Sequence, residues 1–214
     1  MARRAPHPPA ATVVDWSPAL AHLTTADPRL APLIERHGPP TIAPTTDAVH
    51  SLARAIVSQQ LSGAAAATIW GRFLAIYDGN TFPAAAAVLA TPDPKLRAAG
   101  LSGAKTAAVK DLARHVIENR LEPAKLPHAS DDEIAAMLLP VRGIGPWSVD
   151  MFLMFALARP DVLPVGDLGI RKGMQRHFKL RKLPEADKMR KLAQPWRPFR
   201  TAACWYMWRL LESR

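Results

Sequence analysis

Cysteine is almost missing from this chain of 214 residues, where Cys204 is the only one. An intrachain disulfide and a four-cysteine iron–sulfur cluster are therefore excluded, and we expect Cys204 to be a small buried apolar residue. Long apolar runs are missing too, since none reaches the roughly 18 residues that a membrane span needs, and the first residues lack the apolar core of a signal peptide. We therefore expect a cytoplasmic protein that contacts no membrane.

Acidic residues are scarce relative to basic ones, with 18 Asp and Glu against 28 Lys and Arg and a formal net charge of +10. The excess is concentrated between Arg171 and Arg200, where eleven Lys or Arg face only two acids, Glu185 and Asp187. A run of charge is usually just a solvated face, but one this dense favours a surface that meets phosphate groups.

Strand-like alternation of apolar and polar residues is absent beyond a few positions, so the sequence predicts an all-α fold. The seven histidines and the carboxylates show no spacing typical of metal ligands, and we expect no catalytic metal and no cofactor. Nine of the 21 prolines precede residue 45, which predicts short helices there, with Asp27 as an N-cap before Pro28. Residues 1–11 are expected to be a disordered tail.

From Thr46 onward the apolar spacing is that of long helices. One helix is expected to end at Gln59, Gln60 and Leu61, and Ser62 is expected to cap the next. Such a corner can push a side chain into a DNA stack, although residue types alone favour a core leucine and two amides that cap helix ends. Farther on, Ser130 and Glu133 form a capping-box pattern that predicts another helix start.

The stretch LLPVRGIGPWSVDMFLM, residues 138–154, predicts two helices joined by a tight turn, with Pro146 in the first position of the second helix. Gly143 and Gly145 leave no side chain between the turn and an approaching group, so their amides can point outward and attract an anion. Considered alone, the pattern is equally typical of an ordinary turn between helices.

Asp167 precedes a predicted helix that begins at Leu168. Considered alone, an aspartate at this place is at least as typical of an N-cap as of a catalytic group. The same placement suits catalysis, because amide donors and the helix dipole favour an ionised carboxylate.

Four blocks in this order resemble the helix-hairpin-helix DNA glycosylase superfamily, and in particular its alkylation-repair branch, 3-methyladenine DNA glycosylase II: IVSQQLS (56–62), LLPVRGIGPWSVDMFL (138–153), VGDLGIR (165–171) and RPFRTAACWYMW (197–208). The resemblance covers roughly residues 12–212. It implies a two-lobed all-α fold with the active-site cleft between the lobes. Residues 12–214 would form the glycosylase domain, with a central lobe over about 46–125 and the hairpin and catalytic segment over about 130–180.

The resemblance implies an enzyme that flips alkylated bases out of double-stranded DNA and hydrolyses their N-glycosidic bond in base excision repair, acting as a monomer on the nucleoid. Asp167 would be the catalytic carboxylate, and the wedge that fills the gap in the duplex would be Gln60 or Leu61. Aromatic side chains would bind the base: Trp147, Trp208 and Tyr206. We expect Trp16, Trp70 and Trp205 to be core residues instead.

Phosphate contacts are expected from the hairpin and from the start of the basic run: Arg142, Gly143, Gly145, Arg171 and Lys172. The resemblance also implies that the hairpin holds a Na⁺ or K⁺ ion through the backbone carbonyls of Leu139, Val141 and Ile144. In bifunctional members of the superfamily a lysine matches Trp147 and forms a Schiff base with the sugar. Tryptophan cannot form one, so no lyase activity at abasic sites is expected.

Two other functions stay open at this point. The chain could be a non-catalytic helix-hairpin-helix module that binds DNA structure, with Asp167 as a cap and the tryptophans as core. It could also be a glycosylase for mismatched or oxidised bases.

Overall fold

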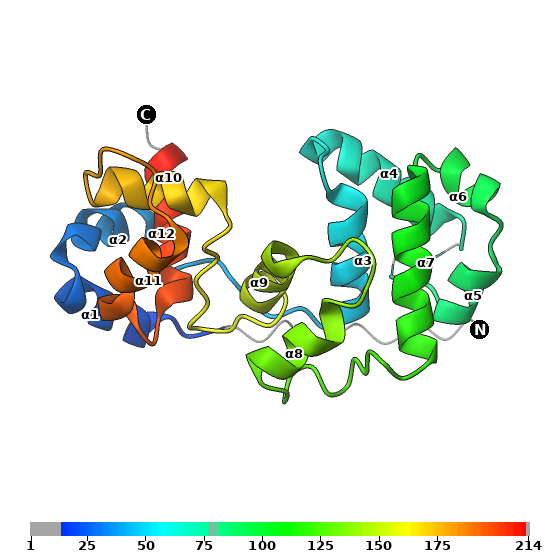
Figure 1. Cartoon of the computed structure of the whole chain (residues 1–214), viewed down its shortest axis with the longest axis horizontal. Helices are drawn as coiled ribbons and strands as arrows, with labels where there is room; N and C mark the ends of the chain where they lie inside the picture. The colour runs from blue at the N-terminus through cyan, green and yellow to red at the C-terminus, as the bar shows by residue number, and fades with distance from the viewer. Residues whose placement is uncertain (1–13, 78, 80, 213–214) are drawn as a thin grey trace, which may run out of the picture. The chain divides into compact units, whose positions relative to one another are not determined.

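The computed structural model describes residues 14–77, 79 and 81–212, and over these residues the chain is helical and contains no strand (Figure 1). The expected tail of residues 1–11 lies outside the described residues. The chain divides into two compact units. The first unit consists of Met1–Thr46 and Leu153–Arg214, and the second unit is Asp47–Phe152.

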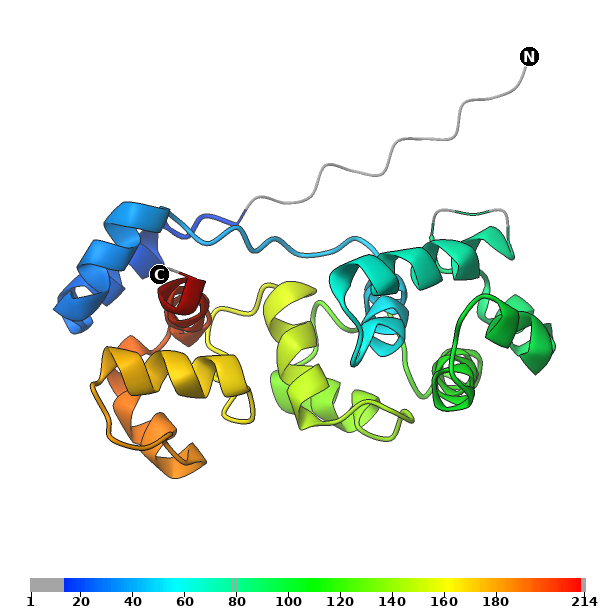
Figure 2. The ribbon, with the colours of Figure 1, turned by 90° about the horizontal axis from the view of Figure 1, so that it is seen from above.

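The second unit is built from short and medium helices, and α3, α4 and α7 lie side by side in it (Figure 2). Side chains cap these helices as the sequence predicts, since Ser62 accepts the Ala65 N–H and Ser130 forms a complete capping box with Glu133. The helices are α3 (Ala48–Ser58), α4 (Gly63–Ala75), α5 (Ala85–Ala90), α6 (Asp93–Ala98), α7 (Gly103–Ile117), α8 (Asp131–Leu138) and most of α9 (Pro146–Phe155).

The first unit is organised around α12, whose residues 201–207 are all buried. Helix α10 can approach α12 closely because Gly173 has no Cβ, and a Cβ there would lie 2.6 Å from the Met207 carbonyl oxygen. The elements of this unit are α1 (Ser17–Ala26), η1 (Pro28–Leu30), α2 (Ala31–His37), α10 (Leu168–His177), α11 (Ala186–Leu192), η2 (Gln194–Trp196) and α12 (Arg200–Glu212).

Three of the tryptophans are core residues as predicted, namely Trp16, Trp70 and Trp205. Cys204 is also fully buried, as predicted. Each of these side chains removes apolar surface from water, which favours folding of the unit that contains it.

Asp27 is the N-cap residue before Pro28, as predicted, but it opens the short η1, and its side chain makes no cap hydrogen bond. The carboxylate is instead buried, with the residue only 2% exposed. Its Oδ2 accepts from His177 Nε2 at 2.7 Å and from Trp196 Nε1 at 3.0 Å, and its Oδ1 accepts from Arg29 Nε at 2.6 Å. The carboxylate turned inward because three donors, two of them from distant parts of the chain, satisfy it better than one helix amide would.

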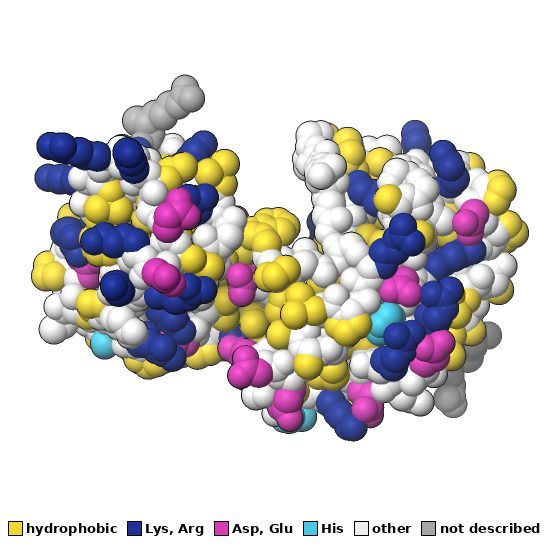
Figure 3. Space-filling view, in the orientation of Figure 1, with side chains coloured by type: hydrophobic (Ala, Val, Ile, Leu, Met, Phe, Trp, Pro, Cys, Tyr) yellow, Lys and Arg dark blue, Asp and Glu magenta, His cyan; other side chains and the backbone are white. Residues whose placement is uncertain are grey.

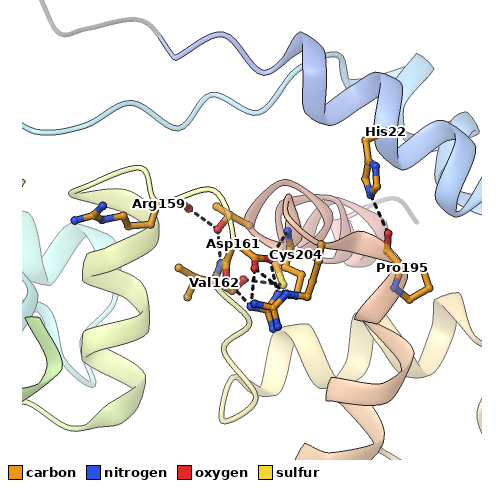
Figure 4. Close-up of polar contacts among 9 residues, drawn as sticks. His22, Arg159, Asp161, Val162, Pro195 and Cys204 are labelled. Atoms are coloured by element: carbon orange, nitrogen blue, oxygen red, sulfur yellow. Dashed lines mark hydrogen bonds and ion pairs between the residues drawn. The ribbon is translucent and has the colours of Figure 1, made fainter. Parts of the chain in front are cut away.

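The segment between α9 and α10 is braced against the start of α12 (Figure 4). The Arg200 guanidinium donates to Asp161 Oδ2 at 2.9 Å and to the Asp161 carbonyl at 2.8 Å. Thr201 Oγ1 accepts the Val162 N–H at 3.0 Å and donates to the Arg159 carbonyl at 2.6 Å. These bonds hold the chain that leads to Asp167 against the helix that contains Trp208.

The described part of the chain has no helix with both the length and the apolar character of a membrane span.

Candidate active site

Asp167 is the N-cap of α10, as the sequence predicts for its local structure. Its Oδ1 accepts the Ile170 backbone N–H at 2.8 Å and the Trp208 indole N–H at 3.0 Å. The side chain is half-buried. One oxygen of the carboxylate is therefore fixed by two donors from different helices, which holds the carboxylate in one orientation before any substrate arrives.

Trp208 lies on α12 and stacks on Phe155, with ring centroids 5.6 Å apart and an angle of 28° between the planes. Phe155 is 44% exposed and Trp208 is half-buried. The first unit thus places an accessible pair of aromatic rings beside the Asp167 carboxylate. Trp208 was predicted to stack on a base, and in the structure its indole N–H also orients the carboxylate.

Gly169 makes this arrangement possible. A Cβ at Gly169 would lie 2.7 Å from Trp208 Nε1 and 3.0 Å from Asp167 Oδ1, which is closer than real Cβ contacts. Gly169 has an ordinary φ that other residues can adopt, so backbone conformation does not require glycine here. The close contact between Asp167 and Trp208 does require it, because it leaves no room for a Cβ.

The prediction that Tyr206 binds the base is wrong. Tyr206 is fully buried, and its hydroxyl donates to the Gly38 carbonyl at 2.7 Å. Burial raises the pKa of Tyr206 to about 12, so the phenol stays a neutral donor. It lies in α12 among residues that are buried on every side, and sequence spacing alone could not separate it from Trp208.

Trp147 lies in the second unit, in the first turn of α9, and is 46% exposed. One turn later on the same helix is Asp150, which is partly buried. Burial raises the pKa of Asp150 to about 6. An exposed indole next to the hairpin is consistent with a role in binding, and that role stays a prediction.

The predicted wedge residues lie at the corner between α3 and α4 in the second unit. Gln60 is exposed and has a left-handed φ of 57°, and Leu61 is 36% exposed. Neither residue is buried in the core, so the alternative that Leu61 is a core leucine is wrong. The corner is a protruding turn, as a wedge requires.

The hairpin between α8 and α9 has the tight turn that the glycines predicted, and Gly143 adopts a φ of 82°. The Arg142 backbone N–H donates to Asp111 Oδ2 at 2.9 Å, while the Arg142 side chain is exposed. Among the described residues, no protein group accepts the amides of Gly143 and Gly145, so these amides are suited to an anion.

The cation site implied for the hairpin rests on backbone carbonyls. The Val141 carbonyl accepts the Ile144 N–H at 3.0 Å, and its second lone pair allows a further contact. Carbonyl oxygens suit Na⁺ and K⁺, and the binding of such an ion by Leu139, Val141 and Ile144 stays a prediction.

Lys and Arg side chains gather over α10 and α11 of the first unit (Figure 3). Arg171 was predicted to bind phosphate, but its guanidinium donates to the Pro184 carbonyl and to Glu185, so contacts within the protein compete with that role. Lys172 is exposed and forms no ion pair with any residue that the structure describes. Of the two, Lys172 is better suited to a phosphate.

Phe155 could not be identified as a site residue from the sequence. It lies near the end of a helix that is apolar on nearly all sides, so no periodicity distinguishes it from core residues. Leu168, which is 52% exposed and next to Asp167, was also not predicted to be a site residue. Only the stacking of Phe155 on Trp208 identifies this pair.

The chain was compared with known proteins. Residues 53–198 match the family of HhH-GPD superfamily base excision DNA repair proteins. DNA-3-methyladenine glycosylase 1 of Schizosaccharomyces pombe is 34% identical over 202 residues, which is 92% of this chain and 88% of that protein.

Two solved structures are also similar to this chain. The 3-methyladenine DNA glycosylase of Schizosaccharomyces pombe in complex with abasic DNA has a TM-score of 0.79 at 32% identity, covering 90% of this chain and 96% of that one. The DNA-3-methyladenine glycosidase of Bacillus halodurans has a TM-score of 0.82 at 31% identity, covering 92% of this chain and 90% of that one. The chain therefore belongs to the HhH-GPD superfamily of base excision DNA repair proteins.

Proposed function

We propose that this DNA glycosylase removes alkylated bases of the 3-methyladenine kind from double-stranded DNA and leaves an intact abasic site. The observation that carries the proposal is the Asp167 carboxylate, fixed by the Ile170 and Trp208 N–H groups beside the Phe155–Trp208 ring pair. The named activity of the relatives supports the substrate class.

The chemistry of the lesion matches this site. A purine alkylated at N3 or N7 is positively charged, so its bond to the sugar is weak and the base leaves as a neutral molecule without a strong general acid. The sugar then develops oxocarbenium character, which a fixed anion stabilises. Asp167 supplies that anion and can direct the attacking water.

Aromatic faces suit a cationic base. A cation over an indole is attracted by about 0.5 to 2 kcal/mol, depending on how far it is desolvated. Trp147 and the Phe155–Trp208 pair are accessible enough to contact a base. Because this preference is modest, we expect the enzyme to accept several alkylated bases and to rely largely on the weakness of the bond in each lesion.

The lack of lyase activity rests on Trp147, which follows the Gly145-Pro146 turn where bifunctional members have a lysine. Without an amine at this position the enzyme can release the base only by hydrolysis. We further propose that the protein acts as a monomer on DNA of the cytoplasmic nucleoid, with Gln60 or Leu61 filling the space that the flipped base vacates.

The test is to incubate the protein with methylated genomic DNA and to identify the freed bases by mass spectrometry. Release of methylated purines by the wild type, and none by Asp167→Asn, is the expected result. A protein that binds duplex DNA but frees no base from methylated, mismatched or oxidised DNA would be a binding module and would refute the proposal.

Borohydride trapping tests the lyase claim separately. The wild type should give no covalent adduct with DNA that contains an abasic site. A trapped adduct would show that another amine attacks the sugar, and the monofunctional assignment would then be wrong.

A further inference from the structure

Lys105, on α7 of the second unit, makes contacts that no proposed catalytic step uses. Its Nζ donates to the Val57 carbonyl at 2.7 Å and to the Gln59 carbonyl at 2.8 Å. These carbonyls lie at the C-terminal end of α3, where a helix leaves acceptors without partners in the helix itself. The ammonium therefore acts as a cap supplied by another helix.

The same corner is bonded to the hairpin. Gln59 Nε2 donates to the Gly143 carbonyl at 2.8 Å, so the residue before the exposed Gln60 is tied to the turn with the outward amides. Gln59 is thus bonded on both sides, through its carbonyl to Lys105 and through its amide to the hairpin.

Helix α7 supports both the corner and the hairpin. Lys105, Ala108 and Asp111 are spaced three residues apart, so each lies beside the next along the surface of α7. Lys105 contacts the corner, and Ala108 lies under Gly143, where an added Cβ would come within 3.3 Å. Asp111 accepts the Arg142 N–H. The corner and the hairpin are thereby held in fixed positions relative to each other.

The corner needs such support. Gln60 adopts a left-handed backbone conformation with a φ of 57°, which costs about 1 kcal/mol in a residue other than glycine. The exposed side chains of Gln60 and Leu61 contribute little burial to offset this cost. Hydrogen bonds on both sides of the turn offset it instead.

We propose that Lys105 is a positioning residue for base excision, which holds the Gln60–Leu61 corner in register with the hairpin amides so that phosphate binding and insertion into the duplex occur together. This inference rests on the proposed function and extends it to residues that touch neither base nor sugar. Burial lowers the pKa of Lys105.

The experiment compares Lys105→Met with Lys110→Met. Both remove an ammonium from α7, but Lys110 pairs with Asp93 and does not contact the corner. Two quantities are measured at a temperature where both variants are folded. One is the single-turnover rate of base release from a duplex with one methylated base. The other is the ratio of affinities for a duplex with an abasic-site analogue and for an intact duplex.

We expect Lys105→Met to lower both the rate and the affinity ratio by about 10-fold, equivalent to about 1.4 kcal/mol, while Lys110→Met stays within about twofold of the wild type. Lys105→Arg keeps donors at this place and should recover most of the loss. Equal behaviour of Lys105→Met and Lys110→Met would overturn the inference. If Lys105→Met does not fold, Gln59→Leu removes the bond to Gly143 and must show the same loss of the affinity ratio.

Failure of the inference can be distinguished from failure of the proposed function. A wild type that releases no alkylated base refutes the proposed function itself. A wild type that releases the base, with Lys105→Met and Gln59→Leu as active and as selective as the wild type, refutes only the positioning role.

Discussion

Asp27 and Asp167 begin from the same sequence pattern, an aspartate directly before a helical segment, and end in opposite environments. Asp27 is 2% exposed and receives donors from Arg29, His177 and Trp196 on both oxygens. Asp167 is half-buried, and its Oδ1 accepts both the cap bond from the Ile170 N–H and the bond from the Trp208 indole N–H. The difference teaches that a carboxylate is structural where the fold surrounds it with donors, and suited to chemistry where the fold orients it and leaves it accessible.

The same substitution in both places should separate the two roles most clearly. Asp167→Asn should lower the rate of base release by at least about 100-fold, because it removes the anion that we propose stabilises the developing charge on the sugar. It should leave the free energy of unfolding nearly unchanged, because asparagine is an equally good N-cap. Asp27→Asn should lower the free energy of unfolding by about 1.5 to 3 kcal/mol, because the buried His177 and Trp196 N–H groups lose a charged acceptor.

The measurements are denaturant unfolding and single-turnover kinetics on the folded fraction of each variant. Asp27→Asn is expected to keep near wild-type activity once folded. The comparison fails if Asp27→Asn loses activity as fully as Asp167→Asn does, or if the two variants are equally destabilised.

Gly169→Ala should disturb the oriented carboxylate without removing it. The added Cβ would meet Trp208 and Asp167 Oδ1, so one of them must move. A misplacement of this size near the reacting atoms can cost up to about 100-fold in rate. Gly166→Ala is the matched control, since a Cβ there meets nothing within 4 Å. A Gly169→Ala enzyme as fast as the control would mean that the contact between Asp167 and Trp208 is not needed for catalysis.

Trp208→Phe sharpens the comparison further, because phenylalanine can still stack on Phe155 but has no N–H for Asp167. A hydrogen bond to a charged group contributes about 1.5 to 3 kcal/mol, and partial compensation by water should limit the loss of rate to about 10-fold. The loss should appear in the rate of the chemical step rather than in the affinity for abasic DNA. A change confined to affinity would assign Trp208 to stacking alone.

The pH dependence of stability should be the smallest effect and should come from the Asp27 region. Burial lowers the pKa of His177 from 6.5 despite its bond to Asp27. Burial opposes a lowered pKa at Asp27, but the donors Arg29, His177 and Trp196 outweigh it. Below pH 6.5 the unfolded chain binds a proton at His177 before the folded chain does, so stability falls with acidification, and Asp27 adds to the fall below about pH 3.8.

Thermal unfolding between pH 7 and pH 5 measures this dependence, whose slope for one group stays below about 1.4 kcal/mol per pH unit. Asp150 has the opposite effect on stability. Burial raises its pKa to about 6, so the folded chain binds a proton there at a higher pH than the unfolded chain does, and acidification stabilises the fold. His177→Asn should therefore flatten the loss of stability, and Asp150→Asn should steepen it. A His177→Asn variant that loses as much stability between pH 7 and pH 5 as the wild type would contradict the assignment to His177.

Local chemistry made much of the fold predictable. Helix starts at Ser62 and Ser130 follow from side-chain oxygens that accept nearby amides, and the hairpin follows from Gly143 and Pro146, so these features needed no knowledge of distant contacts. Asp167 was predictable in the same way. The four resembling blocks then gave the family.

Contacts between segments that are distant in the sequence could not be predicted from this local chemistry. Asp27 turned inward because of His177 and Trp196, which lie more than a hundred residues away in the sequence. Tyr206 and Trp208 differ only in which side of α12 meets the core, and the run 202–208, which is apolar at every position, does not reveal this. Phe155 became a candidate only through its stacking on Trp208.

The first unit is assembled from two separated stretches, Met1–Thr46 and Leu153–Arg214, whereas the second unit is one continuous stretch. During translation the ribosome therefore releases all of the second unit before His177 and Trp196, the distant partners of Asp27, exist. We expect the second unit to fold first as the chain emerges, while the early helices wait for α10 and α12 with part of their apolar surface uncovered. Chaperone demand during synthesis should accordingly depend on residues 14–46 more than on the rest of the protein.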